Sequence, residues 1–246
     1  MPINEQWLEK VIEDPIDPEM PIIDPHHHLW DTANTHVDNP YMQEDLISDL
    51  DSGHNVVSTV FVECSAFYRK SGPEHLRPVG ETEFVNRVAE DSAAKSKDGR
   101  KLCAAIVGHA DLTLGKNVDE VLEAHLEVAP ERMRGIRHSV PWDPNEEIRG
   151  IRAEGLLSNS KFREGARRLP AYNLSFEAWL YHPQIPELTD FARACPEVSI
   201  VFDHFGGPLG IGPYAGKRSE IYQKWNEDVA ELSQCPNVFA KLGGLN

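Results

Sequence analysis

The sequence predicts an α/β fold in which parallel strands alternate with helices, as in a TIM-type (β/α)8 barrel. Short β-rich runs recur along the chain, and most are followed by a segment whose apolar residues have helical spacing. Runs such as VVSTVFVE, LCAAIVG and VSIVF are apolar on both faces, as parallel strands covered by helices must be. No GxGxxG fingerprint follows the first run. One long alternating series therefore favours the barrel over a doubly wound sheet.

The pattern predicts seven strands with six helices between them. The predicted strands are Pro21–Pro25, Val56–Glu63, Leu102–Gly108, Met133–His138, Leu174–Leu180, Val198–His204 and Val238–Leu242. The predicted helices are Glu44–Leu50, Glu81–Ala94, Val118–Val128, Phe162–Arg168, Ile185–Ala194 and Glu220–Leu232.

The predicted organisation is a single domain over residues 1–246, with an N-terminal extension over about residues 1–20. A closed barrel of this type has eight strands, but the sequence ends shortly after the seventh. The expected fold is therefore a barrel truncated after strand seven, without an eighth βα unit. An open edge beside strand seven would promote aggregation, which favours a fragment of a longer gene product.

The charge balance disfavours two classes of partner. With 40 acidic and 24 basic side chains, the formal net charge is −16, so nucleic acid and anionic membranes would be repelled. No apolar run approaches the roughly 18 residues that span a bilayer, and the acidic N-terminus lacks the plan of a signal peptide. We therefore expect a soluble, cytoplasmic protein. Four widely separated cysteines without a CxxC pair are expected to be reduced and mostly structural.

Three consecutive histidines follow the first predicted strand. In extended backbone, side chains alternate, so His26 and His28 should project to one face and His27 to the other. Two imidazoles on one side can converge on one metal ion or one substrate oxygen. The motif lies at the carboxyl end of a strand, where the active sites of barrel enzymes are found.

Polar residues also end other predicted strands. Glu63 is the last residue of the second predicted strand, His109 follows the third, and His204 is the last residue of the sixth. If His204 looks into the barrel mouth, strand alternation turns Asp203 toward the helices. The loop after strand five carries His182, a candidate substrate contact.

The fourth predicted strand ends in Arg137 and His138, of which only one can point inward. Arg137 suits a substrate carboxylate through bidentate contact, whereas His138 could donate a hydrogen bond or act as a base.

Several motifs together resemble the amidohydrolase superfamily, in particular its amidohydrolase-related branch of sugar lactonases and pyrone-dicarboxylate lactonase. The motifs occur in the family's order: DPHHHLWD, GIRHSVPWD, YHPQIPEL, VFDHFGGP and NVFAKLGGL. The resemblance implies a (β/α)8 barrel of the metal-dependent hydrolase type, with His26 and His28 matching the first-strand HxH and His204 the sixth-strand histidine. The family's eighth-strand aspartate, which activates water, would fall beyond Asn246. Its fifth-strand histidine is absent from LSFEAWL, where Glu177 is the only ionisable side chain.

The resemblance implies a hydrolase that opens a lactone or similar ester of a small carboxylated or sugar-derived substrate. His26, His28 and His204 would bind one divalent metal such as zinc, or donate directly to the carbonyl oxygen. Both alternatives stay open, because the branch resembles lactonases that use zinc and others that need no metal.

The substrate is expected to contact four residues: Arg137, His138, Glu63 and His182. A metal-dependent decarboxylase of a small carboxylic acid, a lyase, is the alternative reaction, and a catalytically inactive fragment is a third reading. The expected partner is a small-molecule substrate, and a homo-oligomer is compatible with the sequence.

Overall fold

The computed structural model describes residues 10, 13–31, 39–95, 99–148 and 153–243. The chain divides into two compact units, and each is described by itself. The first unit comprises residues 1–108 and 124–133, and the second comprises residues 109–123 and 134–246. The predicted N-terminal extension falls largely outside the described residues, and the single domain stays a prediction.

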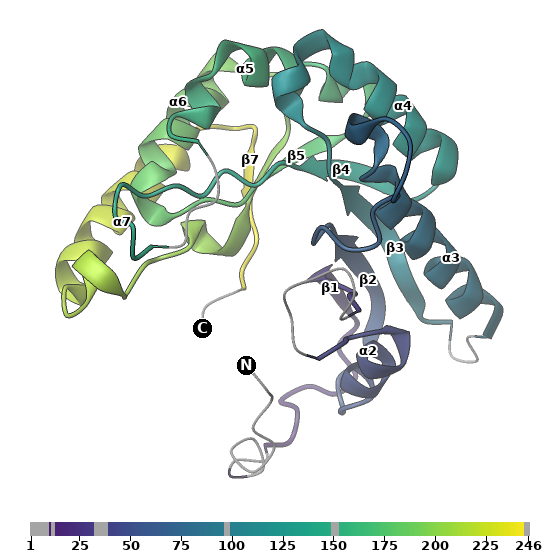
Figure 1. Ribbon diagram of the computed structural model, residues 1–246. Helices are drawn as coiled ribbons and strands as arrows, with labels where there is room; N and C mark the ends of the chain where they lie inside the picture. The colour runs from purple at the N-terminus through teal and green to yellow at the C-terminus, as the bar shows by residue number, and fades with distance from the viewer. Residues whose placement is uncertain (1–9, 11–12, 32–38, 96–98, 149–152, 244–246) are drawn as a thin grey trace. The chain divides into compact units, whose positions relative to one another are not determined.

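The first unit is built on three parallel strands that follow the order of the sequence. These strands are β1 (Ile22–His27), β2 (Val56–Val62) and β3 (Lys101–Gly108). Two helices belong to this unit, α2 (Gln43–Leu50) and α3 (Val79–Lys95), with a short 3-10 turn, η1 (Glu74–Leu76), before α3. α3 packs along β3 (Figure 1). The division between the units passes through α4 (Asp119–Val128).

The second unit contains four parallel strands, again in sequence order. They are β4 (Met133–Arg137), β5 (Ser175–Ala178), β6 (Ile200–Phe202) and β7 (Val238–Ala240). Its helices are α5 (Ser160–Ala166), α6 (Ile185–Ala194) and α7 (Arg218–Leu232). Short 3-10 segments make up most of the connections: η2 (Leu112–Val118), η3 (Leu156–Ser158), η4 (Leu169–Tyr172), η5 (His182–Gln184), η6 (Asp203–Gly206) and η7 (Gly212–Tyr214).

Three phenylalanines define which face of the second sheet is covered by helices. Phe176 of β5 lies 5.7 Å from Phe162 of α5 and 5.4 Å from Phe191 of α6, measured between ring centroids. All three side chains are fully buried, and Figure 1 shows α5 and α6 along one face of the sheet. Because side chains alternate along a strand, Glu177 must project from the opposite face.

The predicted strands and helices are all present among the described residues, and the differences lie at their ends, where α5, for example, begins and ends two residues before the predicted Phe162–Arg168. β1 extends to His27, so the histidine motif begins inside the strand. β6 ends at Phe202, two residues before the predicted end, because His204 adopts a left-handed backbone with φ of 52°. All four cysteines are free, and three of them are buried.

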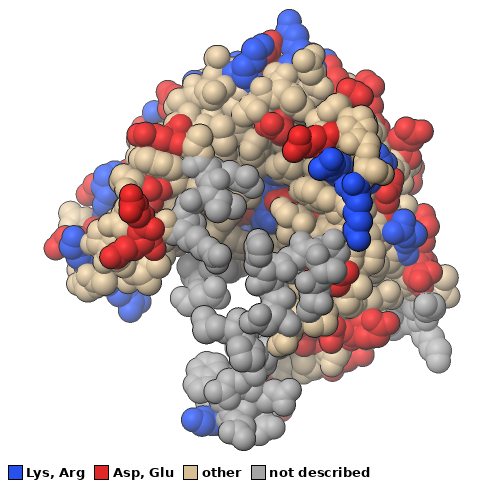
Figure 2. Space-filling model, in the orientation of Figure 1, with Lys and Arg blue, Asp and Glu red and all other residues tan. Residues whose placement is uncertain are grey.

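None of the described helices combines the length and the apolar character needed to cross a bilayer. Figure 2 shows acidic and basic side chains interspersed over the face that it draws.

Close packing of α5 against η2 predicts the effect of a small substitution. A Cβ at Gly165 would collide with the backbone carbonyl of Leu112, which cannot rotate away. We expect Gly165→Ala to lower the free energy of unfolding by about 1–3 kcal/mol, measured by urea denaturation. At Gly210 the same change would meet no atom within 4 Å. Gly210→Ala is the control, and equal stabilities of the two variants would contradict the packing argument.

Candidate active site

The histidines at the end of β1 project to two faces, as strand alternation predicts. The rings of His26 and His28 lie edge to face with centroids 4.9 Å apart, and both side chains are partly exposed. His27 is buried on the other face, where its Nε2 lies 2.9 Å from the hydroxyl of Thr59. Burial lowers the pKa of His27. His26 and His28 are therefore the members of the motif that can meet a ligand.

The proton of His28 is located by a backbone carbonyl. Its Nδ1 lies 2.7 Å from the carbonyl oxygen of Val62, which can only accept a hydrogen bond. Nδ1 therefore carries the proton, and the lone pair of the neutral ring is on Nε2. A histidine that binds a metal typically has this arrangement, with its second nitrogen donating to a carbonyl or carboxylate.

Glu63 begins a tightly held loop after β2. Glu63 is 4% exposed, and its backbone N–H donates to the carbonyl of Val107 at 2.8 Å. Ser65 and Phe67, which follow it, have left-handed φ values of 64° and 56°. Such conformations are unfavourable for residues other than glycine and persist only when their surroundings hold them.

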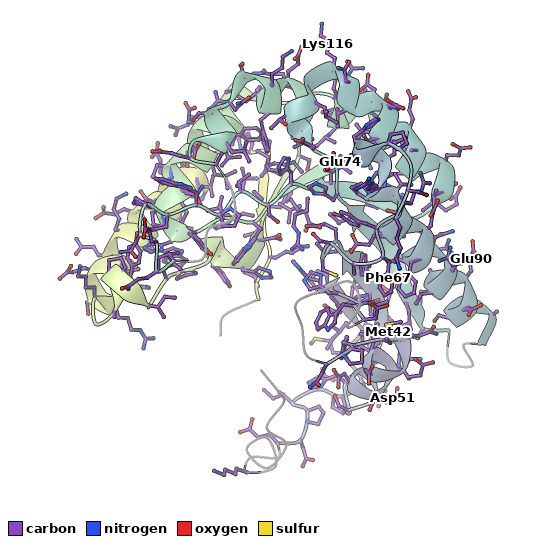
Figure 3. All side chains as sticks on the ribbon, in the orientation of Figure 1. Met42, Asp51, Phe67, Glu74, Glu90 and Lys116 are labelled. Atoms are coloured by element: carbon purple, nitrogen blue, oxygen red, sulfur yellow. The ribbon has the colours of Figure 1, made fainter. Side chains whose placement is uncertain are left out.

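The first turns of α3 hold this loop. The Glu81 carboxylate accepts hydrogen bonds from the backbone N–H groups of Cys64 at 3.0 Å and Ala66 at 2.8 Å. Phe67, labelled in Figure 3, stacks on Phe84 with ring centroids 3.7 Å apart. A Cβ at Gly80 would lie 2.7 Å from the carbonyl oxygen of Phe67, so only glycine allows this approach. The loop that follows Glu63 is therefore rigidly placed.

Glu63 and Glu81 are two buried carboxyl groups that influence each other. Burial and the charge of Glu63 raise the pKa of Glu81 to about 8. Glu81 is 1% exposed, so water gives its charged form little stabilisation.

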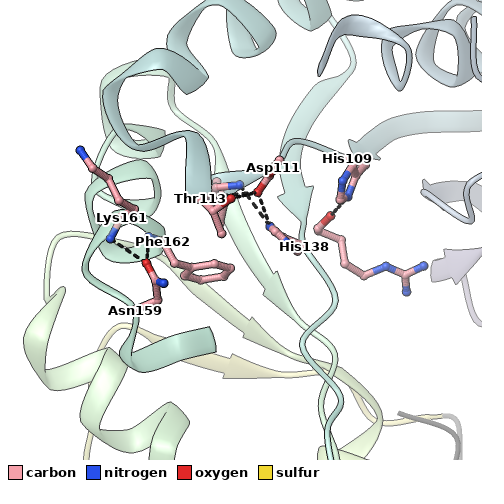
Figure 4. Close-up of polar contacts among 9 residues, drawn as sticks. His109, Asp111, Thr113, His138, Asn159, Lys161 and Phe162 are labelled. Atoms are coloured by element: carbon pink, nitrogen blue, oxygen red, sulfur yellow. Dashed lines mark hydrogen bonds and ion pairs between the residues drawn. The ribbon is translucent and has the colours of Figure 1, made fainter. Parts of the chain in front are cut away.

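In the second unit, His109 and His138 lie at the ends of neighbouring chain segments, with ring centroids 5.3 Å apart (Figure 4). His109 Nδ1 donates to the carbonyl of Arg137 at 2.9 Å, so the lone pair of the neutral ring is on Nε2. His138 has the opposite tautomer, because its Nδ1 accepts the N–H of Leu112 at 3.1 Å. The ring of His138 packs 5.1 Å from Phe162, on the side of the helices.

Arg137 projects from the face of β4 that points away from the helices, whereas His138 lies on the helix side. Only one of these two adjacent residues points away from the helices, as predicted. There it joins three ionisable residues. Lys241 Nζ lies 2.7 Å from Glu177 Oε1 and 3.7 Å from Asp203 Oδ1. Arg137 Nη1 lies 3.9 Å from Asp203 Oδ2. Burial and the charge of Asp203 raise the pKa of Glu177 to about 7, although Lys241 opposes the shift.

Asp203 lies on the face opposite to α5 and α6, so the prediction that it faces the helices is wrong. The prediction assumed extended backbone through His204. Instead His204 and Phe205 both have left-handed φ values of 52°. Backbone of this kind costs of order 1–3 kcal/mol at each residue. The His204 ring meets the edge of Trp179 at a centroid distance of 5.0 Å, and burial lowers its pKa.

His182 helps to hold together the loops that follow β5 and β6. Its Nδ1 accepts the N–H of Leu209 at 3.2 Å, so the neutral ring carries its proton on Nε2. Its ring lies 5.0 Å from that of Tyr214, whose hydroxyl donates to Asp143 at 2.7 Å. Burial lowers the pKa of His182, which favours the neutral ring. A neutral His182 can donate one hydrogen bond from Nε2.

The candidate residues are divided between the two units. His26, His28 and Glu63 belong to the first, and the structure brings the two histidines together. The second holds the others: Arg137, His138, His182 and His204. Sequence reasoning assigned no role to Glu81, Glu177 or Lys241. Lys241 lies inside the predicted strand Val238–Leu242 and directly follows β7, and a charged residue at that position was a readable signal.

Comparison with known proteins gives consistent results. The sequence profile of the amidohydrolase family matches residues 23–246. An L-fucono-1,5-lactonase from Burkholderia ambifaria is 28% identical over 233 residues, which cover 91% of this chain and 67% of the relative.

Two solved structures are similar in fold. A zinc-bound amidohydrolase from Burkholderia multivorans has a TM-score of 0.65 and 21% identity, covering 91% of this chain and 69% of that one. A probable 2-pyrone-4,6-dicarboxylic acid hydrolase from Acinetobacter baumannii, with citric acid bound, has a TM-score of 0.51 and 16% identity. That match covers 84% of this chain and 65% of that one. The predicted fold class, a TIM-type parallel α/β barrel, is confirmed.

The buried carboxyl of Glu81 predicts a pH-dependent stability. The pKa of Glu81 in the folded protein lies above the usual 4.5. Its favourable contribution to the free energy of unfolding is therefore complete at low pH and is lost as the pH rises toward about 8. Glutamine cannot ionise. We therefore expect the thermal midpoint of Glu81→Gln, relative to that of the wild type, to rise as the pH increases from about 5 to about 8. The gain should be at least about 3 °C, since 1 kcal/mol corresponds to about 2–4 °C for a chain of this size.

The exposed Glu90, on the same helix, offers the matched control (Figure 3). Glu90→Gln should follow the pH profile of the wild type, measured by circular dichroism. Parallel profiles for Glu81→Gln and the wild type would show that Glu81 is ionised in the folded protein.

Proposed function

Because the chain belongs to the amidohydrolase family of hydrolases, we propose that it opens the ester bond of a small lactone with water. The observation that carries this proposal is the likeness to an L-fucono-1,5-lactonase over 91% of the chain. The polar residues at the strand ends include histidines that could act on the lactone carbonyl oxygen and an arginine that could bind the substrate. The substrate class is a small sugar-derived or carboxylated lactone.

In this proposal three histidines act on the lactone carbonyl oxygen. His26 and His28 end β1, and His204 follows β6. The carboxyl ends of the strands of a βα barrel share one rim, which supports a common site for them. Their task is to stabilise the negative charge that develops on the carbonyl oxygen when water adds.

The proton position at His28 favours the metal-binding alternative over direct donation. Its Nε2 bears a lone pair, because Nδ1 donates to Val62. Such a nitrogen can ligate a divalent ion, whereas direct donation would require a further proton on the ring. His26, His28 and His204 would hold the metal, and zinc is the ion bound by a structural relative. When bound, a zinc ion polarises the carbonyl as a Lewis acid.

Four further residues are proposed to contact the substrate, with different capacities. Arg137 can bind a carboxylate or a ring oxygen, and the carboxylate of Glu63 can accept from sugar hydroxyls. His182 donates from Nε2 in its neutral form. His138 donates from Nε2 as well, but its ring packs on Phe162 at the helix side, so Arg137 is the principal contact from β4.

The other two readings receive no better support from the relatives. A metal-dependent decarboxylase would release CO₂ from a carboxylic acid, whereas a lactonase releases a ring-opened acid. Product analysis therefore separates them. An inactive fragment predicts no turnover of either substrate class.

Loss of the His204 ring tests the catalytic assignment. We expect His204→Ala to lower kcat for lactone opening by about 10²–10³-fold, as removal of one oxyanion-stabilising group does in other enzymes. Acid release in a pH-indicator assay measures the rate. His54 is exposed on the turn before β2, so His54→Ala is the control and should retain parental turnover. Parental turnover of His204→Ala would refute the assignment.

Metal removal tests the two alternatives for the histidines. We expect the protein to bind one zinc ion, and His28→Ala to weaken zinc binding by at least about tenfold, measured by isothermal titration calorimetry. Chelation should abolish lactone opening, and added zinc should restore it. Full activity after complete chelation would instead assign the histidines as direct donors.

A further inference from the structure

Three charged residues of the second unit, two buried and one half-buried, take no part in the proposed reaction. Glu177, Asp203 and Lys241 come from β5 or directly follow β6 and β7, and they share one face of the sheet. Their side chains are 4%, 0% and 11% exposed. Charges held this far from water must be balanced by one another. With Arg137, the cluster has two cations and two carboxylates.

The pairing of the strands places Lys241 beside Asp203. Phe202 and Ala240 are partners in the parallel register of β6 and β7, and the N–H of Lys241 donates to the carbonyl of Phe202 at 3.0 Å. The Lys241 ammonium then lies between the two carboxylates, closer to Glu177 than to Asp203. Arg137 contacts Asp203 at its other oxygen. Each carboxylate oxygen of Asp203 therefore has a cation within ion-pair distance.

The backbone that follows Asp203 depends on such anchors. His204 and Phe205 both occupy the left-handed region, which two consecutive non-glycine residues do not hold unaided. At the far end of this turn, the indole N–H of Trp225 donates to the carbonyl of Phe205 at 2.8 Å. At the near end the anchor is the Asp203 carboxylate. His204 thus lies between two tertiary contacts, that of the Asp203 carboxylate and that of the Phe205 carbonyl with Trp225, and these limit the direction of its ring.

We propose that Lys241 and Glu177 are positioning residues for His204, acting through Asp203. Glu177 fixes the Lys241 ammonium, the ammonium and Arg137 fix Asp203, and Asp203 fixes the start of the turn that presents His204. The proposal rests on the proposed function in one respect, namely that His204 acts on the substrate. A purely structural cluster would stabilise the sheet without affecting where His204 points.

Three variants of the full chain separate these roles: Lys241→Met, Glu177→Gln and the double variant. Lys241→Met leaves two buried carboxylates with one cation fewer, so both its thermal midpoint and its kcat should fall. We expect kcat to fall by about 10²-fold with KM within about threefold of the wild type, because a small misplacement of a catalytic group has this effect.

The double variant is the decisive one. It removes an opposite pair of charges together, so its thermal midpoint should recover toward that of the wild type. If the cluster positions His204, kcat nevertheless stays low. A merely structural role would restore kcat together with stability. Lys161→Met breaks an exposed ion pair with Glu164 on α5 and is the control, with parental stability and kcat.

Nuclear magnetic resonance of the histidine side chains gives a readout that does not need turnover. The imidazole resonances of His204, assigned with His204→Gln, should shift in all three variants and stay unchanged in Lys161→Met. If the wild type opens no lactone, the proposed function fails, and this measurement still tests the positioning. Unshifted His204 resonances, or parental kcat in the double variant, would overturn the proposal.

Discussion

The alternation of side chains along parallel strands is the constraint on which the rest of the structure depends. On β5 it places Phe176 in the aromatic core under α5 and α6, and Glu177 on the opposite face. On β1 it buries His27 and leaves His26 and His28 accessible. On these two strands one residue therefore points into the core and its neighbour to the opposite face, and the packing on one face fixes the position of polar groups on the other.

Backbone groups decide the chemical character of the histidines. His28 and His109 donate from Nδ1 to carbonyls and keep a lone pair on Nε2. His138 and His182 accept backbone N–H groups at Nδ1 and keep a proton on Nε2. The first kind of ring can bind a cation, and the second can donate to a substrate oxygen. The strand-end backbone thus divides chemically identical side chains into ligands and donors.

In each unit a buried carboxyl group lies beside a strained backbone segment. After β2, Ser65 and Phe67 are left-handed, and the buried carboxylate of Glu81 binds the N–H groups beside them. After β6, His204 and Phe205 are left-handed, and the buried carboxylate of Asp203 is bound by cations. In both places a buried carboxyl group lies beside a defined loop conformation. Strain of this kind is typical of functional sites, which agrees with the position of both segments at strand ends.

Periodicity alone was sufficient to predict the strands, the helices, the barrel class and the separation of His26 and His28 from His27. These features depend on residues close together in the chain, whose spacing can be read directly. The partners of Glu81 and Lys241 could not be predicted, because Cys64 and Glu177 lie 17 and 64 residues away from them. Asp203 shares the face of Val201, which pairs with Glu177, so alternation along β6 accounts for its side. The feature that could not be predicted was the left-handed backbone of His204, which residues other than glycine adopt only when tertiary contacts hold them. Local pattern therefore determined the elements, and long-range electrostatics determined how their ends are arranged.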